Sequence, residues 1–117
     1  MNFLSNLFGS PIPALSVTEL NEKLKNGRPP LVIDVREPAE YHQMHIGGAK
    51  LIPLGELSRR MRELPKDREI VCVCASGSRS SSATKMLVAA GYNAINMNGG
   101  MFTWQRAGLP FKKGSAA

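Results

Sequence analysis

The chain has 117 residues, of which 43% are hydrophobic and 21% are charged, and its formal net charge is +6. This length suits one ordinary domain, and the composition excludes an intrinsically disordered chain. No run of like charges forms a basic arm, so the positive charge predicts a basic surface or attraction of small anions, and no nucleic-acid partner.

The first ten residues are predicted to form an appendage outside the domain. Phe3 and Leu7 lie at one-helix-face spacing, and Gly9 and Pro11 then interrupt the chain. The segment lacks the basic start and unbroken apolar stretch of a signal peptide, and no later stretch approaches the ~18 apolar residues of a membrane span. We therefore expect a cytoplasmic protein with no membrane span, either a monomer or a weak homodimer.

The first half of the chain alternates helix and strand signals. Ser16 and Glu19 have the spacing of a capping box, which predicts the start of a helix that ends before Gly27. An apolar run at 31–35 is typical of a strand buried on both faces. A short helix over 37–44 and a short strand over 49–52 are predicted next.

The second half repeats this alternation. An amphipathic helix is predicted from Leu54 to Met61, followed by a buried strand over 69–74. A helix over 80–90, a strand over 93–97 and a last helix over 101–106 complete the domain. Alternating helices and strands with short connections predict an α/β fold with a mostly parallel sheet.

Cys74 is the strongest candidate for a functional residue. It ends a predicted strand, where parallel sheets bind ligands, and a small-residue loop follows it into a helix N-terminus. Unpaired helical N–H groups, the helix dipole and the charge of Arg79 would all favour a thiolate, so we expect a lowered pKa. Gly77 permits a positive φ that aims amides inward, and the small neighbours Ala75, Ser76 and Ser78 are expected to leave the mouth open.

The alternative is that Cys74 is only a small buried residue, as a free Cys often is. The Ser/Gly/Arg loop favours a functional role. Cys72 differs, because Val71 and Val73 flank it, and we interpret it as core. Since these two cysteines could cross-link nothing distant, the chain is no disulfide scaffold, which suits a reducing compartment.

Four motifs in order resemble the rhodanese family. They span about residues 31–107 and read Asp34-Val35-Arg36-Glu37 with Glu40-Tyr41, then His45-Ile46-Gly47-Gly48-Ala49, then Cys74-x-Ser76-Gly77-x-Arg79-Ser80, and Gly99-Gly100-x-x-x-Trp104. The resemblance implies a single rhodanese-like domain, with a mostly parallel central sheet flanked by helices on both faces. We expect this domain to span 11–112, with a C-terminal tail over 113–117.

The resemblance also implies a chemistry. Cys74 would accept sulfur as a persulfide, which backbone amides from Ala75 to Ser80 would cradle. The expected partners are a small anionic donor such as thiosulfate and an acceptor that is cyanide or a thiol. Cysteine phosphatases with a similar loop carry five residues between Cys and Arg, whereas this chain has four, Ala75 to Ser78, which suits a single sulfur atom better than phosphate.

Two arginines are candidate substrate-binding residues. Arg79 lies within the loop itself and is therefore the stronger candidate for the sulfonate end of thiosulfate, although it could instead pair with a surface carboxylate. Arg36 could face the pocket, or it could pair with Asp34, Glu37 or Glu40. Asp34 lies in an apolar strand, where it needs hydrogen bonds to offset burial of its charge.

No cofactor and no metal are predicted. His42 and His45 have H-x-x-H spacing, but the cysteines lack the C-x₂₋₄-C spacing that zinc sites favour. Two functions remain open at this point. One is a thiosulfate sulfurtransferase, and the other is a sulfur-carrier or persulfide-relay module that acts with a partner protein.

Overall fold

A five-stranded parallel sheet organises the computed structural model, which describes residues 11–115. The strand order is β1-β5-β4-β2-β3, and every neighbouring pair is parallel. The strands are β1 (Ala14–Leu15), β2 (Leu31–Asp34), β3 (Lys50–Leu51), β4 (Ile70–Val73) and β5 (Ala94–Met97). The predicted single α/β domain with a parallel sheet is therefore confirmed. The predicted appendage at 1–10 lies outside the described residues.

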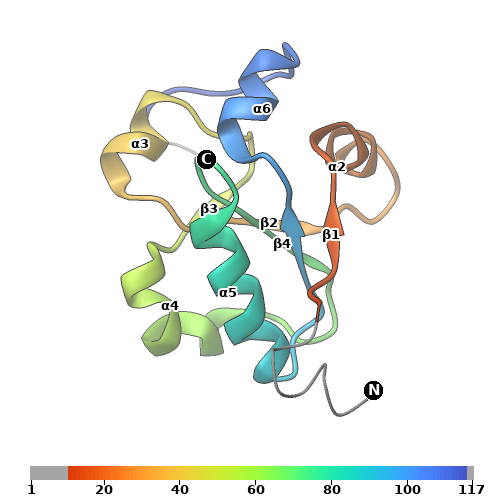
Figure 1. Ribbon diagram of the computed structural model, residues 1–117, viewed down its shortest axis with the longest axis vertical. Coiled ribbons are helices and arrows are strands. Elements are labelled where there is room, and N and C mark those ends of the chain that lie inside the picture. The colour runs from red at the N-terminus through yellow and green to blue at the C-terminus, as the bar shows by residue number, and fades with distance from the viewer. Residues whose placement is uncertain (1–10, 116–117) are drawn as a thin grey trace.

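Helices cover both faces of this sheet (Figure 1). They are α2 (Val17–Leu24), α3 (Pro38–Gln43), α4 (Leu54–Arg60), the short 3₁₀ helix η1 (Met61–Glu63), α5 (Ser78–Ala89) and α6 (Gly100–Arg106). One core cluster joins the sheet to α2 and α6 through Leu20 and Trp104. The other joins it to α4 and α5 through Leu57 and Leu87. Strand β4, at the centre of the sheet, is buried on both sides.

The helix that follows the candidate loop starts earlier than predicted. Helix α5 begins at Ser78, because Gly77 takes the N-cap position with φ +107° and lets the chain turn directly out of the loop. The expectation of a start at Ser80 is wrong by two residues. In contrast, the capping box at Ser16 forms as predicted, with Ser16 Oγ accepting from the amide of Glu19 at 3.1 Å.

Strand β1 is absent from the sequence prediction. It has two residues, which is too short to show a periodic pattern. The amides of Asn96 and Asn98 donate to the carbonyls of Pro13 and Leu15, at 2.9 Å each, and so attach this segment to the sheet edge.

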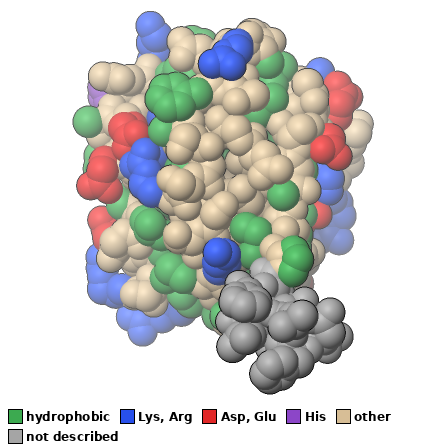
Figure 2. All heavy atoms as spheres, in the orientation of Figure 1, with side chains coloured by type: hydrophobic (Ala, Val, Ile, Leu, Met, Phe, Trp, Pro, Cys, Tyr) green, Lys and Arg blue, Asp and Glu red, His purple; other side chains and the backbone are tan. Residues whose placement is uncertain are grey.

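Charged side chains on the face shown in Figure 2 lie mostly toward its edges, with acidic groups among the basic ones. On helix α4 and η1, the arginines Arg59 and Arg60 pair with Glu56 and Glu63. These pairs give α4 and η1 a surface with charges of both signs. Within residues 11–115, no helix is long and apolar enough to cross a membrane.

Candidate active site

The Cys74 loop lies at the carboxyl edge of the sheet, between the end of β4 and the start of α5. Parallel sheets place their ligand sites at this edge, because the connections there leave the strand ends uncovered. Gly77 adopts the left-handed conformation that only glycine occupies without strain. This turn directs its backbone N–H toward the cysteine.

The Cys74 sulfur receives a hydrogen bond from the loop, as predicted. The amide of Gly77 donates to Sγ over 3.1 Å, and Ser80 Oγ lies 3.3 Å from Sγ. Burial raises the pKa of the Cys74 thiol, but hydrogen bonds from the Ser80 hydroxyl and from the amides of Ser80, Gly77 and Ser76 lower it by more. The net pKa of Cys74 is therefore below the ordinary thiol value of 9.0. The geometry favours a thiolate at this position.

The same sulfur has less access to solvent than we predicted. Cys74 has 0% of its surface exposed, whereas the small residues of the loop were expected to leave the mouth open. The Cys74 side chain packs in the core cluster on the α4 and α5 side of the sheet. The N-terminus of α6 lies against the backbone of the loop. The amides of Met101 and Phe102 donate to the carbonyls of Cys74 and Ala75, at 2.8 and 3.0 Å. The sulfur is therefore covered in this structure.

Gly100 makes this close approach possible. It has a φ of +60°, and a Cβ atom at its position would lie 2.3 Å from the Ala75 carbonyl oxygen and 2.6 Å from the Ser76 nitrogen. Both are backbone atoms, which cannot turn aside as a side chain can. The Gly99-Gly100 pair is thus part of the site as well as a turn.

Cys72 provides the internal contrast. It is fully buried in the core cluster beneath α5, and burial raises the pKa of its thiol to about 11. Both cysteines are free thiols. The core interpretation of Cys72 is confirmed, and two cysteines only two residues apart have pKa values shifted in opposite directions.

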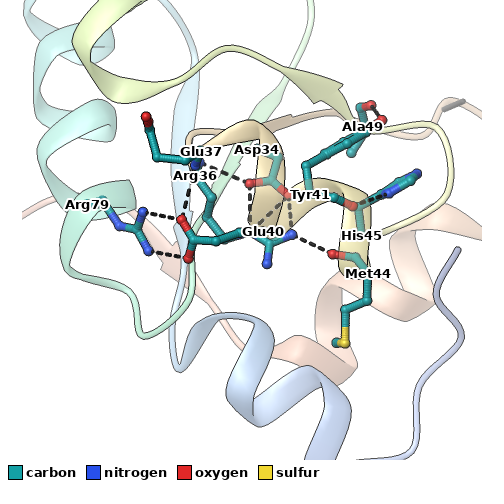
Figure 3. Close-up of polar contacts among 9 residues, drawn as sticks. All are labelled: Asp34, Arg36, Glu37, Glu40, Tyr41, Met44, His45, Ala49 and Arg79. Carbon is teal, nitrogen blue, oxygen red and sulfur yellow. Dashed lines mark hydrogen bonds and ion pairs between the residues drawn. The ribbon is translucent and has the colours of Figure 1, made fainter. Parts of the chain in front are cut away.

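Arg79 pairs with Glu40 (Figure 3). Its two terminal nitrogens donate to the two carboxylate oxygens, at 2.7 and 2.9 Å. Chiefly through these bonds, the pKa of Glu40 falls to about 2 and that of Arg79 rises. Arg79 lies in the first turn of α5. The prediction that it lies within the loop itself is therefore wrong. The bidentate pair ties α5 to α3 and offsets the charge of Arg79.

Arg36 makes a second, more buried ion pair in the same view (Figure 3). Its Nε and Nη2 donate to Asp34, and the shortest of these bonds is 2.8 Å. Nη2 also donates to the Met44 carbonyl at 2.6 Å. Of the carboxylates considered as partners of Arg36, the structure has Asp34, so the charge in the apolar strand is paired. Arg36 also faces the pocket, whose wall it lines.

His45 lies away from the sulfur, within the α3 connection. Its ring stacks on Tyr41 with centroids 3.7 Å apart, and Nδ1 bonds to the Tyr41 carbonyl at 2.8 Å. Backbone bonds also link His45 with Lys112 in both directions, at 2.9 and 2.8 Å. These contacts give His45 a structural role. Within residues 11–115, no group of three or more His, Cys, Asp or Glu side chains could hold a metal ion.

A pocket of 390 Å³ opens beside the loop. It extends from Ala75 past helix α6 to the C-terminal segment, and Cys74 itself is not part of its wall. Its lining residues are Arg36, Glu40, Gln43, Met44, Ala75, Met101, Phe102, Gln105, Phe111 and Lys113. A small molecule in this pocket would lie next to the loop that covers the sulfur.

Residues 16–107, which contain this loop and four of the five strands, match the family described as Rhodanese-like domain. The chain belongs to the rhodanese-like domain family. It is 40% identical over 92 residues to a protein of Allochromatium vinosum named "Sulfurtransferase", covering 78% of this chain and 86% of that one.

Solved rhodanese-like structures share the fold. A rhodanese-related protein from Thermoplasma volcanium has a TM-score of 0.81 and 31% identity, covering 86% of this chain and 97% of the other. A rhodanese-like domain protein from Staphylococcus aureus has a TM-score of 0.77 and 33% identity, covering 80% and 91%. The recognition of a rhodanese-like domain from four motifs is therefore confirmed.

Several residues of this rhodanese-like site were missed by sequence reasoning. Glu40 and Gly100 were named only in the family motifs, with Glu40 also considered as a partner of Arg36, and no role was predicted for Phe102 or Lys113. The double glycine was the one available signal, because paired glycines before a helix indicate close backbone approach. Phe102 and Lys113 belong to no sequence motif, and only the fold brings them to the pocket beside the loop.

Proposed function

We propose that this protein is a sulfurtransferase that carries a sulfane sulfur as a persulfide on Cys74. One observation chiefly supports this function, namely the 3.1 Å hydrogen bond from the Gly77 amide to the Cys74 sulfur at the carboxyl edge of a parallel sheet. An amide that stabilises a thiolate also stabilises the negative charge of a persulfide or of a departing thiolate. Membership of the family and the sulfurtransferase relative support the same chemistry.

Thiosulfate is the proposed donor in the first half-reaction. The Cys74 thiolate attacks the outer sulfur of thiosulfate and forms a new S–S bond. The original S–S bond breaks, and sulfite leaves with its electron pair. The loop residues Ala75, Ser76, Gly77, Ser78 and Ser80 are the proposed binding residues for the transferred sulfur. Because Cys74 is covered, this step needs a displacement of the residues that pack around it.

A second nucleophile completes the cycle. Cyanide or a thiolate attacks the outer sulfur of the persulfide, the bond to Cys74 breaks, and its electron pair returns to Cys74 as the thiolate. No external oxidant or reductant is consumed. Cys74 is thereby regenerated for another turnover.

Arg79 and Arg36 are proposed to contribute positive charge at the donor end. A guanidinium has five N–H groups, and Glu40 occupies two of those of Arg79, so others are left for a sulfonate. Arg36 donates to Asp34 and to the Met44 carbonyl, so fewer of its N–H groups are left for a sulfonate. The Arg79 pair also ties α5, the helix that follows the loop, to α3.

A sulfur-carrier role is the second candidate. The protein YrkF of Bacillus subtilis, named for a proposed sulfur-carrier function, is 38% identical over 96 residues, which cover 81% of this chain and 52% of YrkF. In that role the donor would be a partner protein in the cytoplasm, and thiosulfate would react only incidentally. The two candidate functions differ in the sulfur donor, whereas the chemistry at Cys74 is the same in both.

Steady-state kinetics test the proposal. With thiosulfate and cyanide as substrates, we expect ping-pong behaviour, because sulfite leaves before cyanide binds. We also expect kcat/KM for thiosulfate to rise with pH to a plateau with a midpoint below 9.0, since the thiolate is the nucleophile. A sequential pattern would contradict a persulfide intermediate. A KM for thiosulfate far above cellular concentrations would favour the carrier role.

A further inference from the structure

The pocket beside the loop has an exposed apolar wall. Among residues 11–115, the exposed large hydrophobic side chains are Val88, Phe102 and Phe111, and the last two line this pocket. Phe102 is 63% exposed, although its own amide is bonded to the Ala75 carbonyl at 3.0 Å. An aromatic side chain that stays in solvent beside a reactive loop is available to contact a ligand.

The charges around the pocket do not cancel. Arg36 is paired with Asp34, and Glu40 is paired with Arg79, so these four groups offset one another. Lys113 is the remaining charged residue of the wall, and it has no carboxylate partner within residues 11–115. The pocket therefore presents one uncompensated positive charge.

The backbone around Lys113 is attached to the domain. On one side, the amide of Lys112 donates to the His45 carbonyl at 2.8 Å, and the reciprocal bond measures 2.9 Å. On the other side, the amide of Gly114 donates to the His42 carbonyl at 2.8 Å. The backbone of Lys113 thus has a defined position at the pocket, from which its flexible side chain extends.

We propose that this pocket is the binding site for an organic thiol acceptor with an apolar body and a carboxylate, and that Lys113 determines specificity for the carboxylate. The inference rests on the proposed function and names the acceptor class for it. The volume of 390 Å³ lies within the range of about 300–1,000 Å³ that is typical of sites for small organic ligands. The apolar body would contact Phe102 and Phe111, and the carboxylate would pair with Lys113.

The transfer itself follows the second half-reaction. The acceptor thiolate forms a bond to the outer sulfur of the Cys74 persulfide, the bond between the two persulfide sulfurs breaks, and the electron pair returns to Cys74. The product is the persulfide of the acceptor. Lys113 touches the far end of this acceptor and not the reacting sulfurs.

A matched pair of acceptors tests the inference. With thiosulfate as donor, kcat/KM is measured for 4-(mercaptomethyl)benzoate and for its amide, 4-(mercaptomethyl)benzamide, which has the same shape without the charge. We expect wild type to prefer the carboxylate. Lys113→Ala should lower kcat/KM for the carboxylate about three- to fivefold, as for loss of one exposed ion pair, and leave the amide unchanged. Lys85→Ala removes an exposed charge on α5, away from the pocket wall, and should change neither.

The outcomes separate the inference from the proposed function. Equal loss for both acceptors in Lys113→Ala, no loss for either, or a wild type that does not prefer the carboxylate would overturn the role of Lys113, while turnover with cyanide leaves sulfur transfer intact. Absence of turnover with cyanide and with both thiols would overturn the proposed function, and the inference with it.

Discussion

Replacing Cys74 with Ser is expected to abolish thiocyanate formation from thiosulfate and cyanide. A hydroxyl is not ionised at neutral pH, so the nucleophile is lost, and we expect kcat to fall at least about a thousandfold. The fold should persist, because the Ser hydroxyl can use the same partners, the Gly77 amide and Ser80 Oγ. We expect a change in unfolding free energy of about 1 kcal/mol, measured by urea denaturation.

Cys72→Ser is the matched control for that experiment. It makes the same chemical change two residues away on the same strand, but at a core thiol with no place in the loop. Burying a hydroxyl there should cost about 1–2 kcal/mol of stability, and sulfur transfer should continue in the folded fraction. Turnover retained by the Cys74 variant, or lost in a folded Cys72 variant, would show that the nucleophile has been assigned wrongly.

Replacing Gly100 with Ala is expected to damage stability and sulfur transfer together. The new Cβ would lie 2.3 Å from the Ala75 carbonyl oxygen, so the loop or α6 must shift. A left-handed conformation at alanine costs about 1–2 kcal/mol, and overpacking adds about 1–3 kcal/mol. We therefore expect a loss of about 2–5 kcal/mol in unfolding free energy. Activity of the folded protein should also fall, because the displaced loop no longer directs its amides at the sulfur.

Gly108→Ala isolates the cost of the close contact. Gly108 also has a positive φ, +71°, but a Cβ there would meet nothing within 4 Å. Its loss of stability should stay near 1–2 kcal/mol, with full activity. If the Gly100 and Gly108 variants were equally stable and equally active, the contact between α6 and the loop would have no importance for the site.

The alternation of elements was predictable because each four-residue strand is mostly apolar. Ile70–Val73, buried on all four residues, shows this pattern most clearly. Strand β1 was not predictable, since two residues carry no period and its pairing depends on distant β5. The start of α5 was misplaced because Gly77, interpreted as a loop residue, also serves as the helix N-cap.

The reactive cysteine was predictable because its strand, loop and helix are consecutive in the chain. The partners of the surrounding charges were not. Arg79 and Glu40 lie 39 positions apart, and nothing local distinguishes Glu40 from Glu37 as the acceptor. Likewise, the burial of Cys74 depends on its packing in the core cluster with α4 and α5, which is a property of the whole fold. Local chemistry could therefore be inferred from sequence, whereas access to it could not.

Sulfur transfer by the proposed route requires Cys74 to hold a transferable sulfur atom. The most direct measurement is the intact mass of the protein after incubation with thiosulfate in the absence of thiols, before and after addition of cyanide. We expect wild type to gain the mass of one sulfur atom and to lose it to cyanide, and the Cys74→Ser variant to gain nothing. A wild type that turns over without this gain, or a variant that acquires the same cyanide-sensitive sulfur, would contradict the account.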